Sequence, residues 1–167
     1  MGSPPDHPLL SLALDAATEA GAFLVNERPD VLQIDTKSSR SDSVTEMDRG
    51  SEERIVARIL GARPDDAFLG EEGGERSGTS GVRWIVDPLD GTVNYLYRLP
   101  MWGVSIAAEQ DGEVVVGVVA VPEFGEVYVG VRGQGAWLVR GDRYERLRTS
   151  DVDVLDDALV GTGFAYS

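Results

Sequence analysis

The 167-residue chain has no cysteine and only one histidine, His7, which lies in its N-terminal arm. The absence of cysteine excludes disulfide bonds, thiolate zinc sites and cysteine nucleophiles. With a single histidine, the sequence argues against a Ser-His-Asp triad and against a histidine-rich metal site. Any catalytic or metal chemistry must therefore be sought among oxygen-bearing groups.

Positive charge is also scarce. The chain has 15 lysine and arginine residues against 29 aspartate and glutamate residues, a formal net charge of −14. Nucleic-acid binding depends on lysine and arginine replacing counterions, so we expect no nucleic-acid partner. Most of the excess acid is expected to form an ordinary solvated surface. The places where acidic residues cluster are more informative than their total.

Long apolar runs are absent too. No uninterrupted apolar run approaches the roughly 20 residues of a membrane span, and residues 1–6 lack the basic start of a signal peptide. We therefore expect no membrane partner and a cytoplasmic location. The apolar share of 42% and the charged share of 26% are those of a globular protein and argue against disorder. The length suits one domain, residues 1–167.

Hydrophobic periodicity predicts two helices followed by a sheet. Apolar residues recur at steps of three and four over residues 9–24, and Pro29 follows soon after. A second helix is expected from Thr45, a plausible N-cap, to Gly61, with a short strand at 32–35 between the two helices. Strands are expected at 67–69 and 82–86, separated by a Gly- and Ser-rich mobile loop over residues 73–81.

An antiparallel meander is predicted after Pro100. Its strands are expected at 104–109, 114–121, 127–131 and 136–139, separated by turns such as Asp111-Gly112 and Gly141-Asp142. Residues 157–161 are predicted to form a further apolar strand that enters a new sheet. Helices followed by hairpin strands predict an α+β fold, with two helices packed on a largely antiparallel meander sheet.

Two acidic clusters follow predicted strands. The first contains Glu71 and Glu72, and the second contains Asp87 and Asp90. Carboxylates placed after strands converge at one sheet edge, where four of them would repel one another unless cations neutralise the charge. Oxygen ligands without sulfur or imidazole nearby favour Mg²⁺. The following Gly91-Thr92 offers backbone N–H groups and a hydroxyl to a phosphate.

Simpler interpretations compete with each cluster. Glu71-Glu72 alone is typical of a solvated acidic turn, and Asp48 is typical of a helix start. Asp87 and Asp90 fit a β-turn with proline at its second position, but a simple turn does not explain why both acids follow the apolar run at residues 84–86. For this pair the sequence favours metal binding.

Three ordered motifs resemble the inositol monophosphatase family of Mg²⁺-dependent phosphatases. The central motif is Asp87-Pro88-Leu89-Asp90-Gly91-Thr92-Val93-Asn94-Tyr95. Upstream, Asp42-Ser43-Val44-Thr45-Glu46-Met47-Asp48 is similar to the family's D-x-V-T-x-x-D, and Gly70-Glu71-Glu72 is similar to its G-E-E. The resemblance extends from about residue 9 to the end of the chain. It implies a layered α/β sugar-phosphatase-type fold, of which this chain is the N-terminal portion.

The resemblance also implies roles for individual residues. Glu71, Asp87 and the backbone carbonyl of Leu89 would hold a first Mg²⁺ ion, and Asp87 and Asp90 would share a second. Thr92 would lie beside the attacking water, its hydroxyl oriented by Asp48. The catalytic set is therefore Glu71, Thr92 and Asp48, and the phosphate would be bound by Gly91, Thr92 and Asp90. Glu72 would lie behind the direct ligands.

The family's W-D-x-A-A-G stretch, which completes the second metal site, has no match here. We therefore expect a truncated or partial chain that lacks the C-terminal subdomain and leaves an apolar sheet face exposed to association. The implied reaction is hydrolysis of a small polyol phosphate, with myo-inositol 1-phosphate as the best single candidate and a homodimer as the expected assembly. The alternatives are histidinol-phosphate or fructose bisphosphate hydrolysis, or a catalytically incomplete module that binds metal or dimerises.

Overall fold

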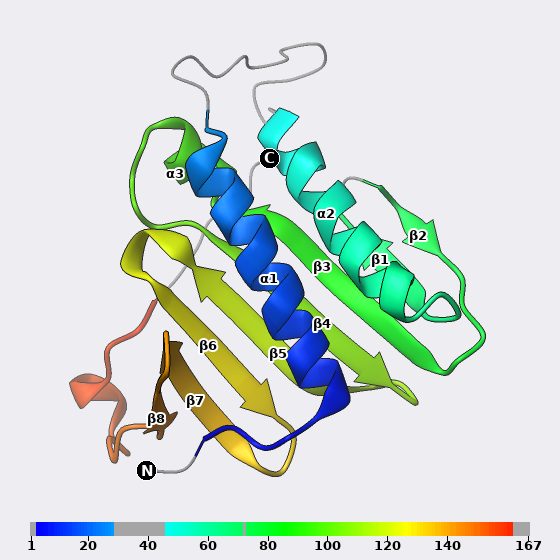
Figure 1. The fold of residues 1–167 in the computed structure, drawn as a ribbon. Helices are drawn as coiled ribbons and strands as arrows, with labels where there is room; N and C mark the ends of the chain where they lie inside the picture. The colour runs from blue at the N-terminus through cyan, green and yellow to red at the C-terminus, as the bar shows by residue number, and fades with distance from the viewer. Residues whose placement is uncertain (1–2, 29–45, 72, 162–167) are drawn as a thin grey trace.

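The computed structural model describes residues 3–28, 46–71 and 73–161, and these residues form two long helices on an eight-stranded sheet (Figure 1). The helices are α1 (Pro8–Asn26), α2 (Glu46–Ala62) and the short α3 (Thr92–Leu96), with 3-10 turns η1 (Pro122–Phe124) and η2 (Leu155–Asp157). The strands, in chain order, are β1 (Ala67–Gly70), β2 (Glu75–Arg76), β3 (Val82–Asp90), β4 (Gly103–Gln110), β5 (Glu113–Val121), β6 (Glu126–Val131), β7 (Gly135–Arg140) and β8 (Arg143–Leu147). The predicted α+β class and the antiparallel meander are confirmed.

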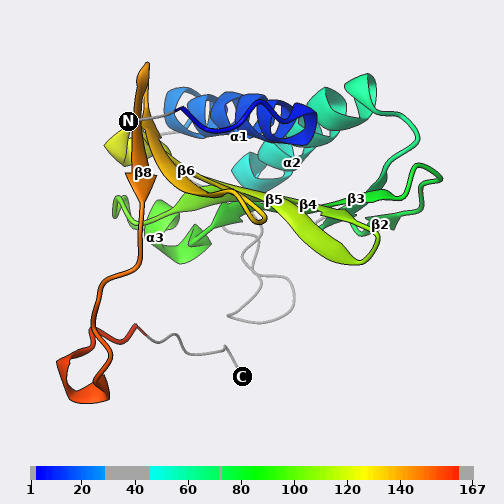
Figure 2. The same ribbon diagram turned by 90° about the horizontal axis from the view of Figure 1, so that it is seen from below.

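Both long helices lie on the same face of the sheet (Figure 2). Helix α1 packs on β4, β5 and β6, and α2 packs on α1 and β3. The apolar positions of α1 predicted from periodicity are buried except for Leu14, which is partly buried, because a 3.6-residue repeat keeps them on one side of the helix. By length and composition α1 could also cross a membrane. Its burial in this fold, with Ala13, Ala17 and Leu24 fully enclosed, is that of a core helix.

The register of β1 and β3 decides where the acidic clusters lie. These two strands are parallel, and Gly70 pairs with Val86. Every other neighbouring pair in the sheet is antiparallel, in the order β2-β1-β3-β4-β5-β6-β7-β8. The next residue after each member of the Gly70 and Val86 pair is acidic, namely Glu71 and Asp87.

The amino ends of the same two strands are joined by Asp66, whose side chain is only 1% exposed. Its carboxylate accepts hydrogen bonds from Arg63 Nε at 2.5 Å, Ser80 Oγ at 2.6 Å and Trp84 Nε1 at 2.8 Å. Burial pushes the pKa of Asp66 upward, but the three donors and the charge of Arg63 outweigh it, so the pKa is lowered. Asp66 therefore ties α2, β1 and β3 together as an ionised carboxylate.

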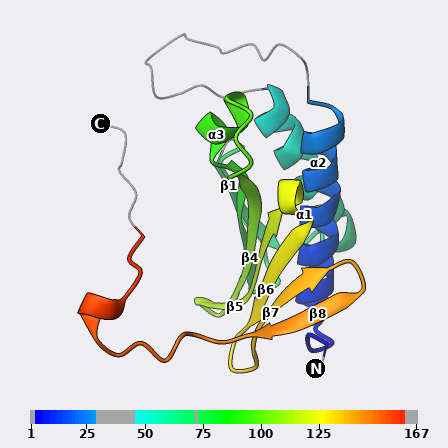
Figure 3. The same ribbon diagram turned by 90° about the vertical axis from the view of Figure 1, so that its left-hand side faces the viewer.

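Three predictions of local structure were wrong or incomplete. The loop over residues 73–81 contains strand β2, which pairs with β1. Strand β3 continues beyond residue 86 to Asp90, with a register irregularity between Asp87 and Asp90. The strand predicted at residues 157–161 does not form, because a strand needs a neighbour to pair with: Asp157 ends η2, and residues 158–161 have no regular structure. The segment after β8 runs away from the sheet on the side opposite the helices (Figure 3). The strand predicted at 32–35 and the Thr45 cap lie outside the described residues.

Candidate metal and phosphate site

Glu71, which directly follows β1, and Asp87, which lies three residues before the end of β3, are side by side. The parallel register brings their backbones together, and the two side chains share a hydrogen bond. Glu71 is exposed and Asp87 is half-buried. The predicted convergence of the two acidic clusters at one sheet edge is therefore seen for these two residues.

The pKa of Asp87 is raised to about 7 from its ordinary value of 3.8. Burial is the largest cause, followed by the negative charges of Glu71 and Asp90. In the absence of a cation, the site keeps a proton that an isolated aspartate would have lost. A divalent ion can replace that proton and supply the missing positive charge.

The segment after Asp87 folds back toward its own carboxylate. The Leu89 N–H donates to Asp87 Oδ1 at 3.2 Å, and the Thr92 hydroxyl donates to the Leu89 carbonyl oxygen at 3.0 Å. Gly91 adopts φ +85°, a left-handed conformation that glycine tolerates best, and an added Cβ would lie 2.9 Å from the carbonyl oxygen of Met101. Asp87, Leu89 and Thr92 are therefore linked by hydrogen bonds.

Helix α2 supports this segment with polar residues. Asp48 is buried in its first turn, and Ser51 Oγ donates to the Pro88 carbonyl oxygen at 2.8 Å. Glu52, 5% exposed, accepts from the Gly73 N–H at 2.8 and 3.0 Å and so fixes the turn that carries Glu71. The role predicted for Asp48 toward Thr92 stays a prediction.

Sequence reasoning did not identify Ser51 and Glu52. Helical spacing contained the signal, because residues 48, 51, 52, 55 and 59 fall on one face of a helix. The two apolar members of that face, Ile55 and Ile59, are fully buried. Ser51 and Glu52 continue this buried face toward the start of α2. There they hydrogen-bond to the backbone of Pro88 and Gly73, beside the acidic residues of the site.

The described residues do not include a preformed group of three acidic or imidazole ligands around a cation position. Glu71 and Asp87 meet, whereas Asp90 is exposed and acts on Asp87 through its charge. Glu72 and Asp42 lie outside the described residues. The donor set of two touching carboxylates, a nearby third and a backbone carbonyl still fits a hard divalent cation such as Mg²⁺.

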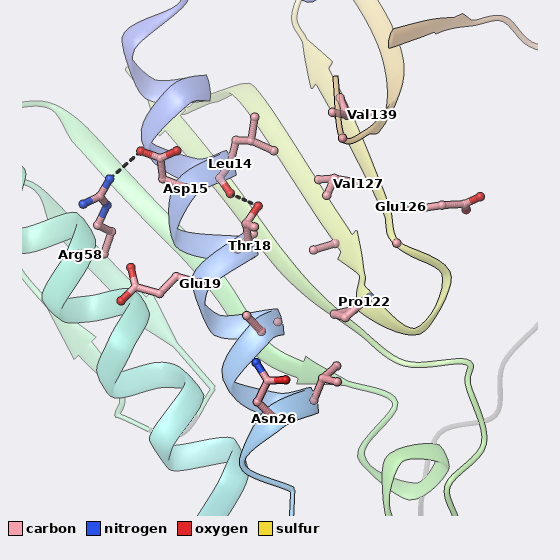
Figure 4. Close-up of a pocket in the computed structure, with 17 residues that line it drawn as sticks. Leu14, Asp15, Thr18, Glu19, Asn26, Arg58, Pro122, Glu126, Val127 and Val139 are labelled. Carbon is pink, nitrogen blue, oxygen red and sulfur yellow. Dashed lines mark hydrogen bonds and ion pairs between the residues drawn. The ribbon is translucent and has the colours of Figure 1, made fainter. Parts of the chain in front are cut away.

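A cavity of about 870 Å³ lies away from the acidic residues, between α1 and strands β5, β6 and β7 (Figure 4). Leu14, Val127 and Val139 contribute apolar surface, and Asp15 and Arg58, which also line the cavity, form a 2.6 Å ion pair. None of the predicted site residues lines it. The acidic edge and the large cavity are therefore separate features.

Comparison with known proteins agrees with the family that the sequence motifs resemble. The model of the inositol monophosphatase family matches residues 6–167. The chain belongs to the inositol monophosphatase family. An inositol-1-monophosphatase of Rhizobium meliloti is 44% identical to this family member over 158 residues, which is 93% of the chain and 58% of the relative. The Nus factor SuhB of Escherichia coli K12 is 40% identical over 163 residues, or 96% of the chain and 59% of the relative.

Solved structures of the family confirm the fold. The crystal structure of the SuhB protein from Bartonella henselae matches with a TM-score of 0.79 and 39% identity, covering 87% of this chain and 56% of that one. An IMPase from Thermotoga maritima matches with a TM-score of 0.76 and 32% identity, covering 87% and 55%. This family member thus spans somewhat more than half the length of the relatives that it matches.

Proposed function

We propose that the chain carries the metal- and phosphate-binding part of a Mg²⁺-dependent phosphatase that hydrolyses small polyol phosphates. The observation that supports this most strongly is the pair of touching carboxylates, Glu71 and Asp87, in which Asp87 retains a proton up to about pH 7. Family membership supports phosphate monoester hydrolysis as the reaction. Myo-inositol 1-phosphate is the substrate that we propose first.

The site residues have three proposed roles: binding metal, orienting water and binding phosphate. Bound Mg²⁺ would supply a water of lowered pKa and positive charge beside the phosphoryl group. Glu71, Asp87 and the Leu89 carbonyl would hold one ion, and Asp87 with Asp90 would hold a second. The Thr92 hydroxyl, held near Leu89, would orient the water with the help of Asp48, and the Gly91 and Thr92 amides would bind phosphate oxygens.

We further propose a cytoplasmic location and a homodimer. The large excess of negative charge is unfavourable for binding nucleic acid and equally unfavourable for binding an anionic membrane surface. A small phosphorylated polyol, which reaches the site with its charge neutralised by the divalent ions, is compatible with this surface.

The test is phosphate release with Mg²⁺ from myo-inositol 1-phosphate, histidinol phosphate and fructose 1,6-bisphosphate. Asp87→Asn keeps the shape of the side chain but removes the charge, and we expect it to reduce turnover by about a thousandfold or more. Asp15→Asn is the matched control, because Asp15 is an exposed aspartate on α1 with its own ion pair. Equal activity of the Asp87→Asn protein and the unaltered protein would refute the proposal.

A catalytically incomplete module is the alternative, and the same proteins separate it from the first proposal. An incomplete module would take up Mn²⁺ or Mg²⁺ through Asp87 without releasing phosphate from any of the three substrates. The enzyme proposal requires both metal uptake and phosphate release to depend on Asp87.

A further inference from the structure

The carboxyl ends of α1 and α3 are joined by two side chains, Tyr95 and Arg28, that have no assigned role in the proposed reaction. Tyr95, on α3, is completely buried, and its hydroxyl donates to the Leu24 carbonyl oxygen at 2.7 Å. The last carbonyls of a helix lack the usual partner four residues further along the chain. At the end of α1 the Phe23 carbonyl still accepts from the Glu27 N–H at 2.9 Å, and the Leu24 carbonyl is the next one. The Tyr95 hydroxyl therefore caps α1.

Arg28 makes the reverse connection from α1 to α3. Its guanidinium Nη2 donates to the Tyr95 carbonyl oxygen, which also accepts from the Arg98 N–H at 3.1 Å. The guanidinium carbon lies 4.2 Å from the centre of the Tyr95 ring, and Nη1 is 3.6 Å from Glu123. The side chain of Arg28 is only 9% exposed. Each helix is thus capped by a side chain that belongs to the other helix segment.

Helix α3 depends on such contacts because it is short. Its five residues cannot form a stable helix alone, since the first turn costs more than one or two hydrogen bonds return. The Tyr95 ring also packs edge-on against Trp102, with ring centres 4.9 Å apart. Burial raises the pKa of Tyr95 to about 12, so its hydroxyl keeps the donated proton at neutral pH.

The other end of α3 reaches the acidic site. Thr92 is the first residue of α3, and its hydroxyl donates to the Leu89 carbonyl oxygen, the proposed metal ligand. The Tyr95 N–H donates to the Gly91 carbonyl oxygen at 3.0 Å, which joins the capped end of α3 to the site segment within one turn. These hydrogen bonds therefore connect Tyr95, through α3, to Thr92 and Leu89.

We propose that Arg28 and Tyr95 are positioning residues of the metal and phosphate site, acting through α3 on Thr92 and the Leu89 carbonyl. This inference rests on the proposed function, since it needs a metal to be bound at that carbonyl. Neither side chain contacts the site itself. Their effect is to hold α3 in the one orientation that places the Thr92 hydroxyl on Leu89.

The test uses the full chain with Tyr95→Phe, Arg28→Met and Arg28→Lys. Tyr95→Phe keeps the ring and removes only the hydroxyl, and Arg28→Lys keeps the charge beside Glu123. The matched controls are Ser80→Ala and Arg63→Met, which remove a hydroxyl and an arginine from Asp66 at the opposite end of β3. Each protein is titrated with Mn²⁺ in the presence of inorganic phosphate, and amide hydrogen exchange is followed over residues 91–97.

We expect Mn²⁺ to bind about tenfold more weakly to Tyr95→Phe and Arg28→Met, the usual effect of losing a partner behind a metal ligand. Exchange over residues 91–97 should quicken in the same two proteins, and Arg28→Lys should recover part of both losses. The controls should lose thermal stability and bind Mn²⁺ as the unaltered protein does.

Two results would overturn the inference alone. One is unchanged Mn²⁺ affinity in both Tyr95→Phe and Arg28→Met. The other is an equal loss of affinity in the controls, which would show general destabilisation. If the unaltered protein takes up no Mn²⁺, the proposed function fails, and the inference that depends on it fails too.

Discussion

Asp87 is the residue on which the chemistry depends most. It is half-buried, touches Glu71 and lies within the field of Asp90, so its ionisation is costly without a cation. The motif predicted its identity as a ligand. The raised pKa of Asp87 could not be predicted from the sequence, because it depends on the register of β1 against β3 and on the burial of the side chain.

The first prediction concerns pH and Asp87 in the metal-free protein. The folded pKa of about 7 lies above the ordinary value of 3.8, so between these values the folded state binds more protons and its stability falls as pH rises. A three-unit shift corresponds to roughly 4 kcal/mol, which we reduce to about 2 kcal/mol because water screens the exposed neighbours. Asp87→Asn should therefore be about 2 kcal/mol more stable than the unaltered protein at pH 8, by urea unfolding in EDTA.

At pH 4 the two proteins should unfold at nearly the same urea concentration, which serves as the internal control. A constant difference across the pH range would contradict the assignment of the raised pKa to Asp87.

The second prediction concerns Asp66, whose pKa shift has the opposite sign. Its lowered pKa means that its stabilisation is present above about pH 4, the ordinary value, and is lost as pH falls through the folded pKa. Asp66→Asn leaves Arg63 without its carboxylate partner and should cost about 2 to 3 kcal/mol at pH 7. Thermal unfolding between pH 3 and pH 7 should show that the stability difference between the unaltered protein and Asp66→Asn becomes smaller as the pH is lowered. An equal loss at pH 3 would contradict it.

At the scale of the elements, periodicity located the secondary structure better than it located the site. Alternating and 3.6-residue patterns predicted α1, α2 and strands β4 to β7. Beyond the turn at Gly141-Asp142 no strand was predicted, because β8 is almost entirely exposed and has no apolar alternation. The continuation of β3 from Asp87 to Asp90 was not predicted, because proline and two aspartates are unfavourable in regular strands. This part of β3 also contains a register irregularity. The pairing of β2 with β1 was missed because two exposed residues leave no hydrophobic pattern.

The third prediction concerns the contact between α2 and the turn after β1. A Cβ added at Gly70 would lie 2.2 Å from Glu52 Oε1, and Glu52 is held in place by the Gly73 N–H. Gly70→Ala should therefore cost about 1 to 3 kcal/mol and weaken Mn²⁺ binding by displacing Glu71.

Gly117→Ala is the control for this substitution. Gly117 is also a strand glycine, but a Cβ there meets no atom within 4 Å. Gly117→Ala should be neutral or slightly stabilising, since alanine loses less entropy on folding. Chemical denaturation of both proteins checks the comparison, and equal costs at the two positions would contradict the close contact at Gly70.

At the scale of the whole molecule, the net charge of −14 places the acidic site within a negative field. Family membership and the layered fold followed from the ordered motifs and from the order of helices and strands. The contacts of Arg28 with Tyr95 did not, because 67 residues separate the two positions in the sequence.

The fourth prediction separates specific metal binding from general screening of that charge. Mg²⁺ should raise the thermal midpoint more than sodium chloride at equal ionic strength, because a ligand that binds only the folded state stabilises it by mass action. The excess should disappear in Asp87→Asn. If both salts act alike on the unaltered protein, Mg²⁺ acts only by screening.

Binding of metal by Glu71, Asp87 and Leu89 can be observed in a crystal structure of the chain with Mn²⁺ and inorganic phosphate, in which the anomalous signal of manganese places the ion. We predict a peak bonded to carboxylate oxygens of Glu71 and Asp87 and to the Leu89 carbonyl oxygen, at distances near 2.2 Å, within the usual range for hard divalent cations. An ordered structure with millimolar Mn²⁺ and no peak at those oxygens would show that these residues do not hold the metal.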